Sequence, residues 1–169
     1  MKNRILSVLF LCLGLVCSSS LWADDVYYNI PAPEQGPYAE INSIKVDHNV
    51  NVKGQKGMRI HVNLNAFDVM DHELLVCVYF YFEEGKALRG MPGTKFITND
   101  GNATVQSSAI AKEENISWKD FTLFMPYVFL NMPMGKNSVN LEGRVSIFDK
   151  TAKTWLTSDY GLFGFSFSY

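Results

Sequence analysis

Apolar and polar side chains alternate with a period of two over much of the chain, which is the pattern of β-strands that bury one face. The clearest example is the segment Met58–Asn65. We expect its apolar side chains to face a core and its polar ones to face water; they are Met58, Ile60, Val62 and Leu64, against Arg59, His61, Asn63 and Asn65. Aspartate in place of Val62 should therefore unfold the domain, whereas alanine in place of His61 should have little effect.

Further strand-like segments follow with turn residues between them; they are Ile41–Val50, Leu74–Phe82, Ala103–Ile110, Lys119–Met125, Val139–Phe148 and Phe163–Tyr169. Leu74–Phe82 is apolar on both faces, as a central strand covered on both sides would be. Asp100-Gly101 predicts a tight hairpin turn between Phe96–Asn99 and Ala103–Ile110. No segment has the period of an α-helix of three turns. The sequence therefore predicts an all-β fold, an antiparallel two-sheet sandwich of seven to eight strands, immunoglobulin-like or C2-like.

The start of the chain has the order of a secretory signal, which is a positive start, a short apolar run and small residues. We expect a signal peptide over residues 1–23, an extended Pro-rich lead-in over 24–37 and the β-sandwich domain over 38–169. Cleavage after Ala23 is favoured, and cleavage after Ser20 is the alternative. The domain would then be exported to the periplasm or the extracellular space. A second interpretation attaches it to lipid through Cys17.

Composition narrows the class of protein further. The chain has 15 Lys and Arg against 17 Asp and Glu, and loss of Lys2 and Arg4 with the leader leaves 13 against 17. This balance argues against a nucleic-acid partner, and no segment after the leader is long and apolar enough for a transmembrane span. Aromatic residues make up 14% of the chain, which favours a packed core over disorder.

Cys77 is the single cysteine after the leader, so no internal disulfide is expected, and we interpret it as a packing residue. The oligomeric state stays open.

Four segments resemble an uncharacterised family of small exported β-sandwich domains from Bacteroides-like gut bacteria; they are Val46–Val50, Gly54–Val62, Tyr79–Phe82 and Asp120–Tyr127. The resemblance implies the sandwich fold and an exported protein, and it transfers no catalytic residue. The usual form has polar residues after the Pro-Tyr pair. Here Val128-Phe129-Leu130 follows, which makes this crossing a candidate contact surface.

Acidic side chains cluster on the predicted loop 67–73. Asp68, Asp71 and Glu73 suggest a calcium site, because carboxylates on the loops of a sandwich hold this cation in some binding modules. Calcium takes six to eight oxygen ligands, so a second loop would have to contribute, through Asp149 or Asp100. An ordinary solvated turn is the favoured interpretation.

The sequence gives weaker indications of a zinc site and of a copper(I) site. The three histidines are His48, His61 and His72. A hairpin register that pairs Val46 with Ile60 or Val62 places His48 and His61 on opposite faces, which argues against a shared zinc ion. Met132 and Met134, with Met91 and Met125 elsewhere, suggest copper(I) or a plain hydrophobic corner. We favour the corner and predict no cofactor, with calcium as the alternative.

No spacing forces a catalytic pair or triad together, so we do not expect an enzyme. Four aromatic residues form the candidate ligand-binding set, with complete burial in the core as the alternative; they are Tyr79, Tyr81, Trp118 and Trp155. Rings left exposed on a sheet face would bind a partner. The sequence thus favours an exported, non-catalytic module that binds a protein or cell-envelope partner. The alternative is a calcium-assisted carbohydrate-binding domain.

Overall fold

The computed structural model describes residues 36–132, 138–157 and 159–168. The predicted signal peptide, the candidate lipidation site Cys17 and Met134 lie outside these residues. The described residues form eight β-strands and one short 3-10 helix, and none of their helices is long and apolar enough to cross a membrane. The elements are β1 (Tyr38–Val52), β2 (Gln55–Phe67), β3 (Glu73–Phe82), β4 (Thr104–Ile110), β5 (Ile116–Pro126), η1 (Tyr127–Phe129), β6 (Ser138–Asp149), β7 (Thr154–Trp155) and β8 (Gly161–Ser168).

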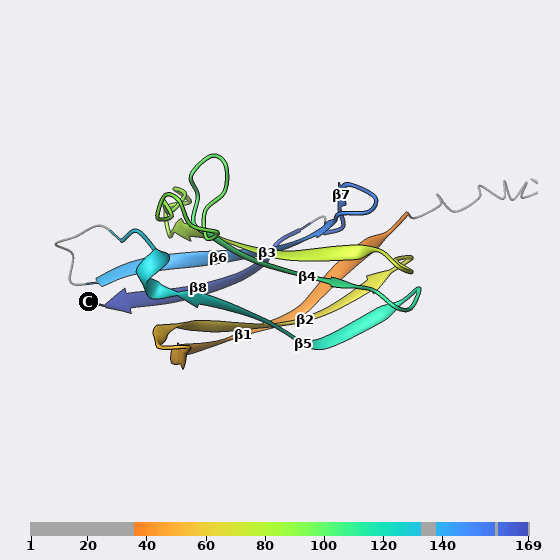
Figure 1. Ribbon diagram of the computed structural model, residues 1–169, viewed down its shortest axis with the longest axis horizontal. Coiled ribbons are helices and arrows are strands. Elements are labelled where there is room, and N and C mark those ends of the chain that lie inside the picture. The colour runs from red at the N-terminus through yellow and green to blue at the C-terminus, as the bar shows by residue number, and fades with distance from the viewer. Residues whose placement is uncertain (1–35, 133–137, 158, 169) are drawn as a thin grey trace, which may run out of the picture. The chain divides into compact units, whose positions relative to one another are not determined.

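The strands form two antiparallel sheets that pack face to face (Figure 1). One sheet has the order β1-β2-β5, and the other has the order β4-β3-β6, with β7 and β8 both paired to β6. The predicted all-β, antiparallel two-sheet sandwich is confirmed. The segment that is apolar on both faces is β3, which pairs with β4 on one side and β6 on the other, as expected of a central strand.

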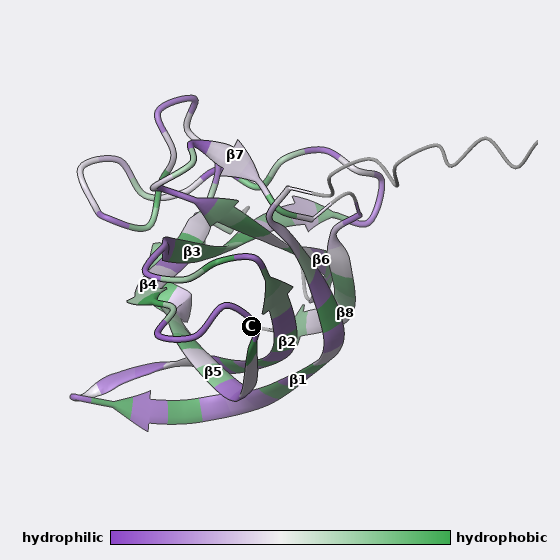
Figure 2. Cartoon of the chain, turned by 90° about the vertical axis from the view of Figure 1, so that its right-hand side faces the viewer, coloured by the Kyte–Doolittle hydropathy of each residue, from purple (hydrophilic) through white to green (hydrophobic). Residues whose placement is uncertain are grey.

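The core lies between the sheets and follows the predicted alternation. Met58, Ile60, Val62 and Leu64 are all fully buried. Val76 and Val78 of β3 and Ile147 of β6 are equally buried in the second sheet. Figure 2 shows the two sheets around this interior, with hydrophobic and hydrophilic residues alternating along the strands. The period-two pattern therefore identified the inward side of β2 correctly.

The predicted hairpin at Asp100-Gly101 forms, but it is shorter than expected. The Thr98 amide donates to the carbonyl of Asn102 at 2.9 Å, and Gly101 takes a φ of +88°. Pairing before the turn is a single bridge between Ile97 and Ala103, so the prediction of a strand over Phe96–Asn99 is wrong. That segment belongs to the irregular loop between β3 and β4.

The two sides of the sandwich differ. On one side the sheets join, because the Ala39 amide of β1 donates to the carbonyl of Leu156 at 2.9 Å. Gly161 at the start of β8 also lies so close to Ile41 and Ile44 that a Cβ there would stand 2.7 Å from the Ile44 side chain. On the other side β4 and β5 are edge strands, since each pairs with a single strand of its own sheet among the described residues.

Candidate functional site

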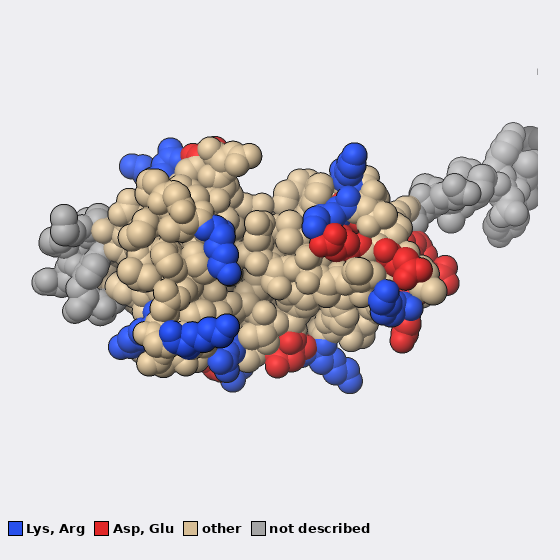
Figure 3. All heavy atoms as spheres, viewed as in Figure 1, with Lys and Arg blue, Asp and Glu red and all other residues tan. Residues whose placement is uncertain are grey.

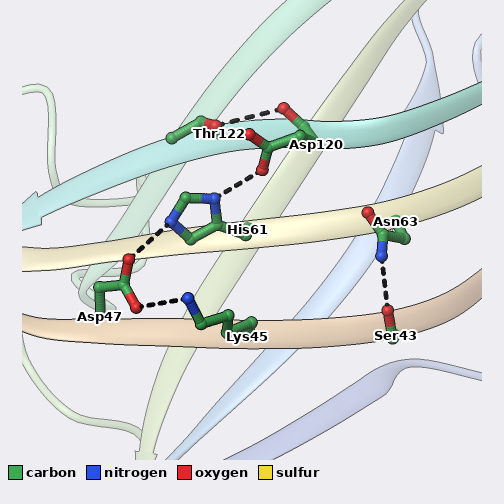
Figure 4. Close-up of polar contacts among 7 residues, drawn as sticks. All are labelled: Ser43, Lys45, Asp47, His61, Asn63, Asp120 and Thr122. Carbon is green, nitrogen blue, oxygen red and sulfur yellow. Dashed lines mark hydrogen bonds and ion pairs between the residues drawn. The ribbon is translucent and has the colours of Figure 1, made fainter.

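The outer face of the β1-β2-β5 sheet carries a network of polar side chains (Figure 4). His61 on β2 lies between two carboxylates, with Nδ1 2.5 Å from Asp120 Oδ1 on β5 and Nε2 3.2 Å from Asp47 Oδ2 on β1. Lys45 Nζ lies 3.0 Å from the other oxygen of Asp47. Hydrogen bonding to Lys45, and then the contact with His61, lowers the pKa of Asp47. The network therefore ties three strands together by their side chains.

The same face continues with Asn63, whose amide donates to Ser43 Oγ at 2.8 Å. These cross-strand contacts follow from the register, which pairs Ser43 with Asn63 and Lys45 with His61. Polar groups that already bond one another offer little to a ligand. We therefore interpret this face as structural.

The outer face of the other sheet is aromatic instead. We call it the aromatic face; it comprises Tyr79 and Tyr81 of β3, Arg144 and Phe148 of β6, Trp155 of β7, Tyr160, and Leu162 of β8. Three of these side chains are about half exposed, namely Trp155 at 51%, Tyr160 at 48% and Leu162 at 55%. The loop after β3 and the hairpin around β7 rise on this side, away from β1, β2 and β5 (Figure 1). Trp155 and Tyr160 thus keep about half of their surface open to solvent.

Arg144 lies at the centre of the aromatic face. Its guanidinium carbon is 4.1 Å from the ring centre of Tyr81 and 4.9 Å from that of Tyr160, which are cation–π distances. Its Nε donates to Glu142 Oε1 at 2.5 Å, and this hydrogen bond raises the pKa of Arg144. A carboxylate and two rings therefore hold this cation in a fixed position.

Tyr79 and Phe148 are less exposed than Trp155, Tyr160 and Leu162. Burial, followed by the neighbouring Cys77, raises the pKa of Tyr79, so its hydroxyl stays a neutral donor and acceptor at physiological pH. Cys77 is 2% exposed, and burial raises the pKa of its thiol, which agrees with a packing role. Phe148 and Trp155 meet edge to face with their ring centres 5.0 Å apart.

The structure brings together three of the four predicted aromatic residues. Tyr79, Tyr81 and Trp155 share the aromatic face, whereas Trp118 lies on β5 in the other sheet. Trp118 packs against the core and stacks on Phe121 with the ring centres 5.2 Å apart. The reason is its register with Leu64, a buried residue of β2, since residues paired across two strands point to the same face.

Sequence reasoning missed Arg144, Tyr160 and Leu162. Arg144 had a detectable signal, because it is an outward position in an alternating strand. Tyr160 and Leu162 had none, because their place on this face depends on the pairing of β8 with β6.

Two of the three predicted calcium ligands, Glu73 and Asp71, lie against basic side chains. Glu73 accepts hydrogen bonds from Lys150 Nζ at 2.5 Å and Ser108 Oγ at 2.7 Å, and these bonds lower its pKa. Asp71 Oδ1 lies 3.7 Å from Lys112 Nζ, and Asp68 and Asp71 are both exposed with a φ of +58°. The three acids lie near one turn but do not converge.

The second-loop donors that calcium would need are also occupied. Asp149 is fully buried, with Oδ2 2.5 Å from His72 Nδ1, while its other oxygen accepts from the amides of Thr151 and Ala152. Asp100 bonds within its own turn, to Thr98 and Asn102. Nowhere in the described ranges do three His, Cys, Asp or Glu side chains gather closely enough to hold a metal ion.

Among the described residues, the three histidines have different partners and do not share a centre that could bind zinc. His48 Nδ1 lies 3.2 Å from the Tyr127 hydroxyl, while His61 and His72 contact different aspartates. Met125 is buried in the core, and Met91 and Met132 line a shallow pocket beside Tyr127.

The apolar crossing at Val128-Phe129-Leu130 is only partly a surface. Val128 is 57% exposed, but Leu130 is buried. Phe129 stacks on Phe96 with the ring centres 4.6 Å apart.

No protein-family model matches the chain, and no curated protein matches it in sequence. Two solved structures align with it, a β-glucuronidase from Bacteroides uniformis and a protein from Archaeoglobus fulgidus, each with 11% identity and a TM-score of 0.39. The alignments cover 79% of this chain and 13% of the glucuronidase, and 77% of this chain and 98% of the Archaeoglobus protein. The chain thus spans a small part of the length of the glucuronidase. Likeness at this level adds nothing to the fold described above.

Proposed function

We propose that this chain is an exported, non-catalytic binding module that engages a protein partner of the cell envelope through its aromatic face. The observation that carries the proposal is the contrast between the two outer faces. One is a polar network whose groups bond one another, and the other presents two half-exposed rings and an arginine that lies over one of them.

The composition of the aromatic face fits a protein interface. Tyrosine, tryptophan and arginine are the side chains that contribute most to protein–protein binding. The two aromatic side chains bury large areas with few rotatable bonds, and arginine adds charge and several hydrogen-bond donors. Trp155, Tyr160 and Leu162 have area left to bury. Export is supported by the signal-like order of residues 1–23.

Site-specific photo-crosslinking in the native cell envelope tests the proposal. A photoreactive residue at Leu162 should form a discrete crosslinked product, and the same probe at Ser43 on the polar face should not. The product should disappear with excess unlabelled domain. With the purified partner, Leu162→Asp should weaken binding by about tenfold or more, while Ser43→Asp should not change it. Equal crosslinking from both faces would contradict the proposal.

Calcium-assisted carbohydrate binding is the rival function. Titration calorimetry with calcium, and then with a glycan panel in the presence and absence of calcium, separates the two. We expect no heat of calcium binding, because Lys150 and Ser108 hold Glu73 and Lys112 faces Asp71.

A further inference from the structure

A groove runs along the open side of the sandwich, between the edge strands β4 and β5. We call it the edge groove. It has a volume of about 730 Å³ and continues to the β1–β2 turn and to the loop between β3 and β4. Ser107 lies on the inward face of β4 and yet is exposed to solvent, so the space between the sheets is open to solvent here. Ser107 is paired with Val76, which is fully buried, yet Ser107 itself is exposed.

The backbone of β4 offers hydrogen bonds to this groove. Its pairing with β3 has no bulge, and it is flanked by two hydrogen bonds that fix the phase of the ladder. The Phe80 amide donates to the carbonyl of Ala103 at 3.1 Å, and the Ala111 amide donates to the carbonyl of His72 at 2.9 Å. Hydrogen-bonded residues alternate along an antiparallel pair, so the odd-numbered residues of β4 bond β3 and the even-numbered ones turn away.

One even-numbered residue already demonstrates this outward direction. The Thr104 amide donates to the carbonyl of Phe96, at 3.0 Å, and not to β3. Beyond it, the amides and carbonyls of Gln106 and Ser108 have no backbone partner within the part of the chain that the structure describes. An edge of this kind is a template for one more strand.

The walls of the groove are apolar. Val105 and Leu123 are buried side chains at its base, and the stacked pair Phe96 and Phe129 closes one end. A strand added beside β4 would direct every second side chain toward these residues and the others toward solvent. The groove therefore selects a segment with alternating apolar residues.

The charge at the rim selects the remaining positions. Lys53 and Lys95 line the groove, and no Asp or Glu does. Neither lysine forms an ion pair with an acid that the structure describes, and Lys95 lies over the Phe96 ring at 5.3 Å. In Figure 3 most of the acidic side chains lie toward the right-hand end of the domain, and fewer lie at its upper left and along its lower edge. A partner strand with carboxylates at its solvent-facing positions would match this rim.

We propose that the edge groove binds an extended acidic segment of a partner protein, which adds as a further strand to β4. The mode is β-augmentation, in which main-chain hydrogen bonds give affinity and alternate side chains give specificity. This surface and the aromatic face involve different residues, so the two proposals fail or hold separately.

The probe is a short fluorescent peptide of alternating valine and glutamate with blocked ends. We expect saturable binding by fluorescence anisotropy, together with slower hydrogen exchange at the amides of Gln106 and Ser108. A valine–lysine peptide should bind at least about tenfold more weakly because it repels the rim. A valine–glutamate peptide that is N-methylated at alternate residues should not bind, because it cannot complete the ladder.

Protein variants locate the binding site. Lys53→Glu with Lys95→Glu should weaken binding of the valine–glutamate peptide by about tenfold, and Lys119→Glu, an exposed lysine of β5 outside the groove, is the matched control. Gln106→Pro should abolish binding while the β3–β4 ladder survives, because proline is tolerated where a strand's amide faces away from its neighbour. Leu162→Asp on the aromatic face should leave peptide binding unchanged.

Three outcomes would overturn the proposal. The first is that the valine–glutamate peptide does not bind at millimolar concentration. The second is that binding persists both with the N-methylated peptide and with the double lysine variant, and the third is that the peptide protects amides elsewhere than on β4. Sedimentation of the domain alone adds a fourth. A dimer that Gln106→Pro dissociates would assign the β4 edge to a second copy of this chain and not to an acidic partner.

Discussion

At the scale of single residues, charged side chains on this domain acquire defined partners from strand pairing. Glu73 opens β3 and is held by Lys150 and Ser108, and Asp47 lies between Lys45 and His61. In both cases the hydrogen bonds favour the charged carboxylate and lower its pKa. The stability of the folded domain is therefore linked to pH through these groups.

The free energy of unfolding should decrease as the pH falls below neutral. Glu73→Gln should make this decrease smaller. Since the folded pKa of Glu73 lies below its ordinary value of 4.5, the unfolded chain binds a proton first as the pH drops. The free energy of unfolding then decreases from near that ordinary value down through the folded pKa. Urea unfolding from neutral pH to about pH 3 measures the slope. Glu113→Gln, an exposed glutamate on the loop before β5, is the control, and an unchanged slope in Glu73→Gln would contradict the linkage.

At the scale of single elements, alternation along β2 decides which substitutions the fold tolerates. Its inward side chains are fully buried, while the adjacent outward ones belong to the polar network. One residue of displacement along the strand thus moves a side chain from the core to the surface.

Val62→Asp should unfold the domain or cost about 4 kcal/mol or more, because it buries a carboxylate with no partner. Asn63→Asp adds the same group one position away on the outer face, and it should leave the domain folded. His61→Ala should also leave it folded, since its contacts with Asp47 and Asp120 lie on the outer face of the sheet. Circular dichroism with urea titration compares the three. A folded Val62→Asp would mean that the facing of β2 is wrong.

A second element-scale feature is the pairing of a glycine on β6 with a phenyl ring on β8. Gly143 is paired with Phe163, and a Cβ on Gly143 would stand 2.1 Å from the phenyl ring. The ring therefore occupies the space that any other residue at position 143 would need.

Gly143→Ala should cost about 2 kcal/mol of stability by overpacking this pair. Gly164→Ala is the matched control on the neighbouring strand, because its Cβ would have no atom closer than 3.9 Å. Chemical unfolding of both variants measures the difference. Phe163→Leu in the Gly143→Ala background should restore part of the loss, and equal stability of the two alanine variants would refute the steric explanation.

At the scale of the whole molecule, closure of the sandwich sorts residues of one type into different environments. Trp118 and Trp155 are both tryptophans on strands, yet Trp118 packs on the core beside Phe121 and Trp155 is half exposed beside Phe148. The same closure leaves one side of the molecule open at β4 and β5.

Trp118→Ala should destabilise the domain by about 3 kcal/mol, because it removes a large ring from the core. Trp155→Ala should change stability by less than about 1 kcal/mol, since it is a surface substitution, and should act on partner binding instead. Thermal and urea unfolding of the two variants, followed by the crosslinking assay for Trp155→Ala, provide the comparison. Comparable losses of stability would mean that Trp155 is a core residue and not part of a binding surface.

Much of the fold was predictable from the sequence because burial has a local signature in a strand. The period of two identified the inward residues of β2, and the doubly apolar segment identified β3 as a central strand. The Asp-Gly turn was also predictable, since positive φ favours glycine, although the short pairing before it was not.

What only the tertiary structure decided is which strands become neighbours and which edges stay open. Cross-strand partners such as His61 with Asp120, or Tyr81 with Arg144, lie far apart in the sequence, and no local pattern encodes the register that unites them. The separation of Trp118 from the other predicted aromatic residues has the same origin. The alternation of apolar and polar residues determines which side of each strand is buried. The aromatic face and the edge groove arise only when strands distant in the sequence pair and the two sheets pack.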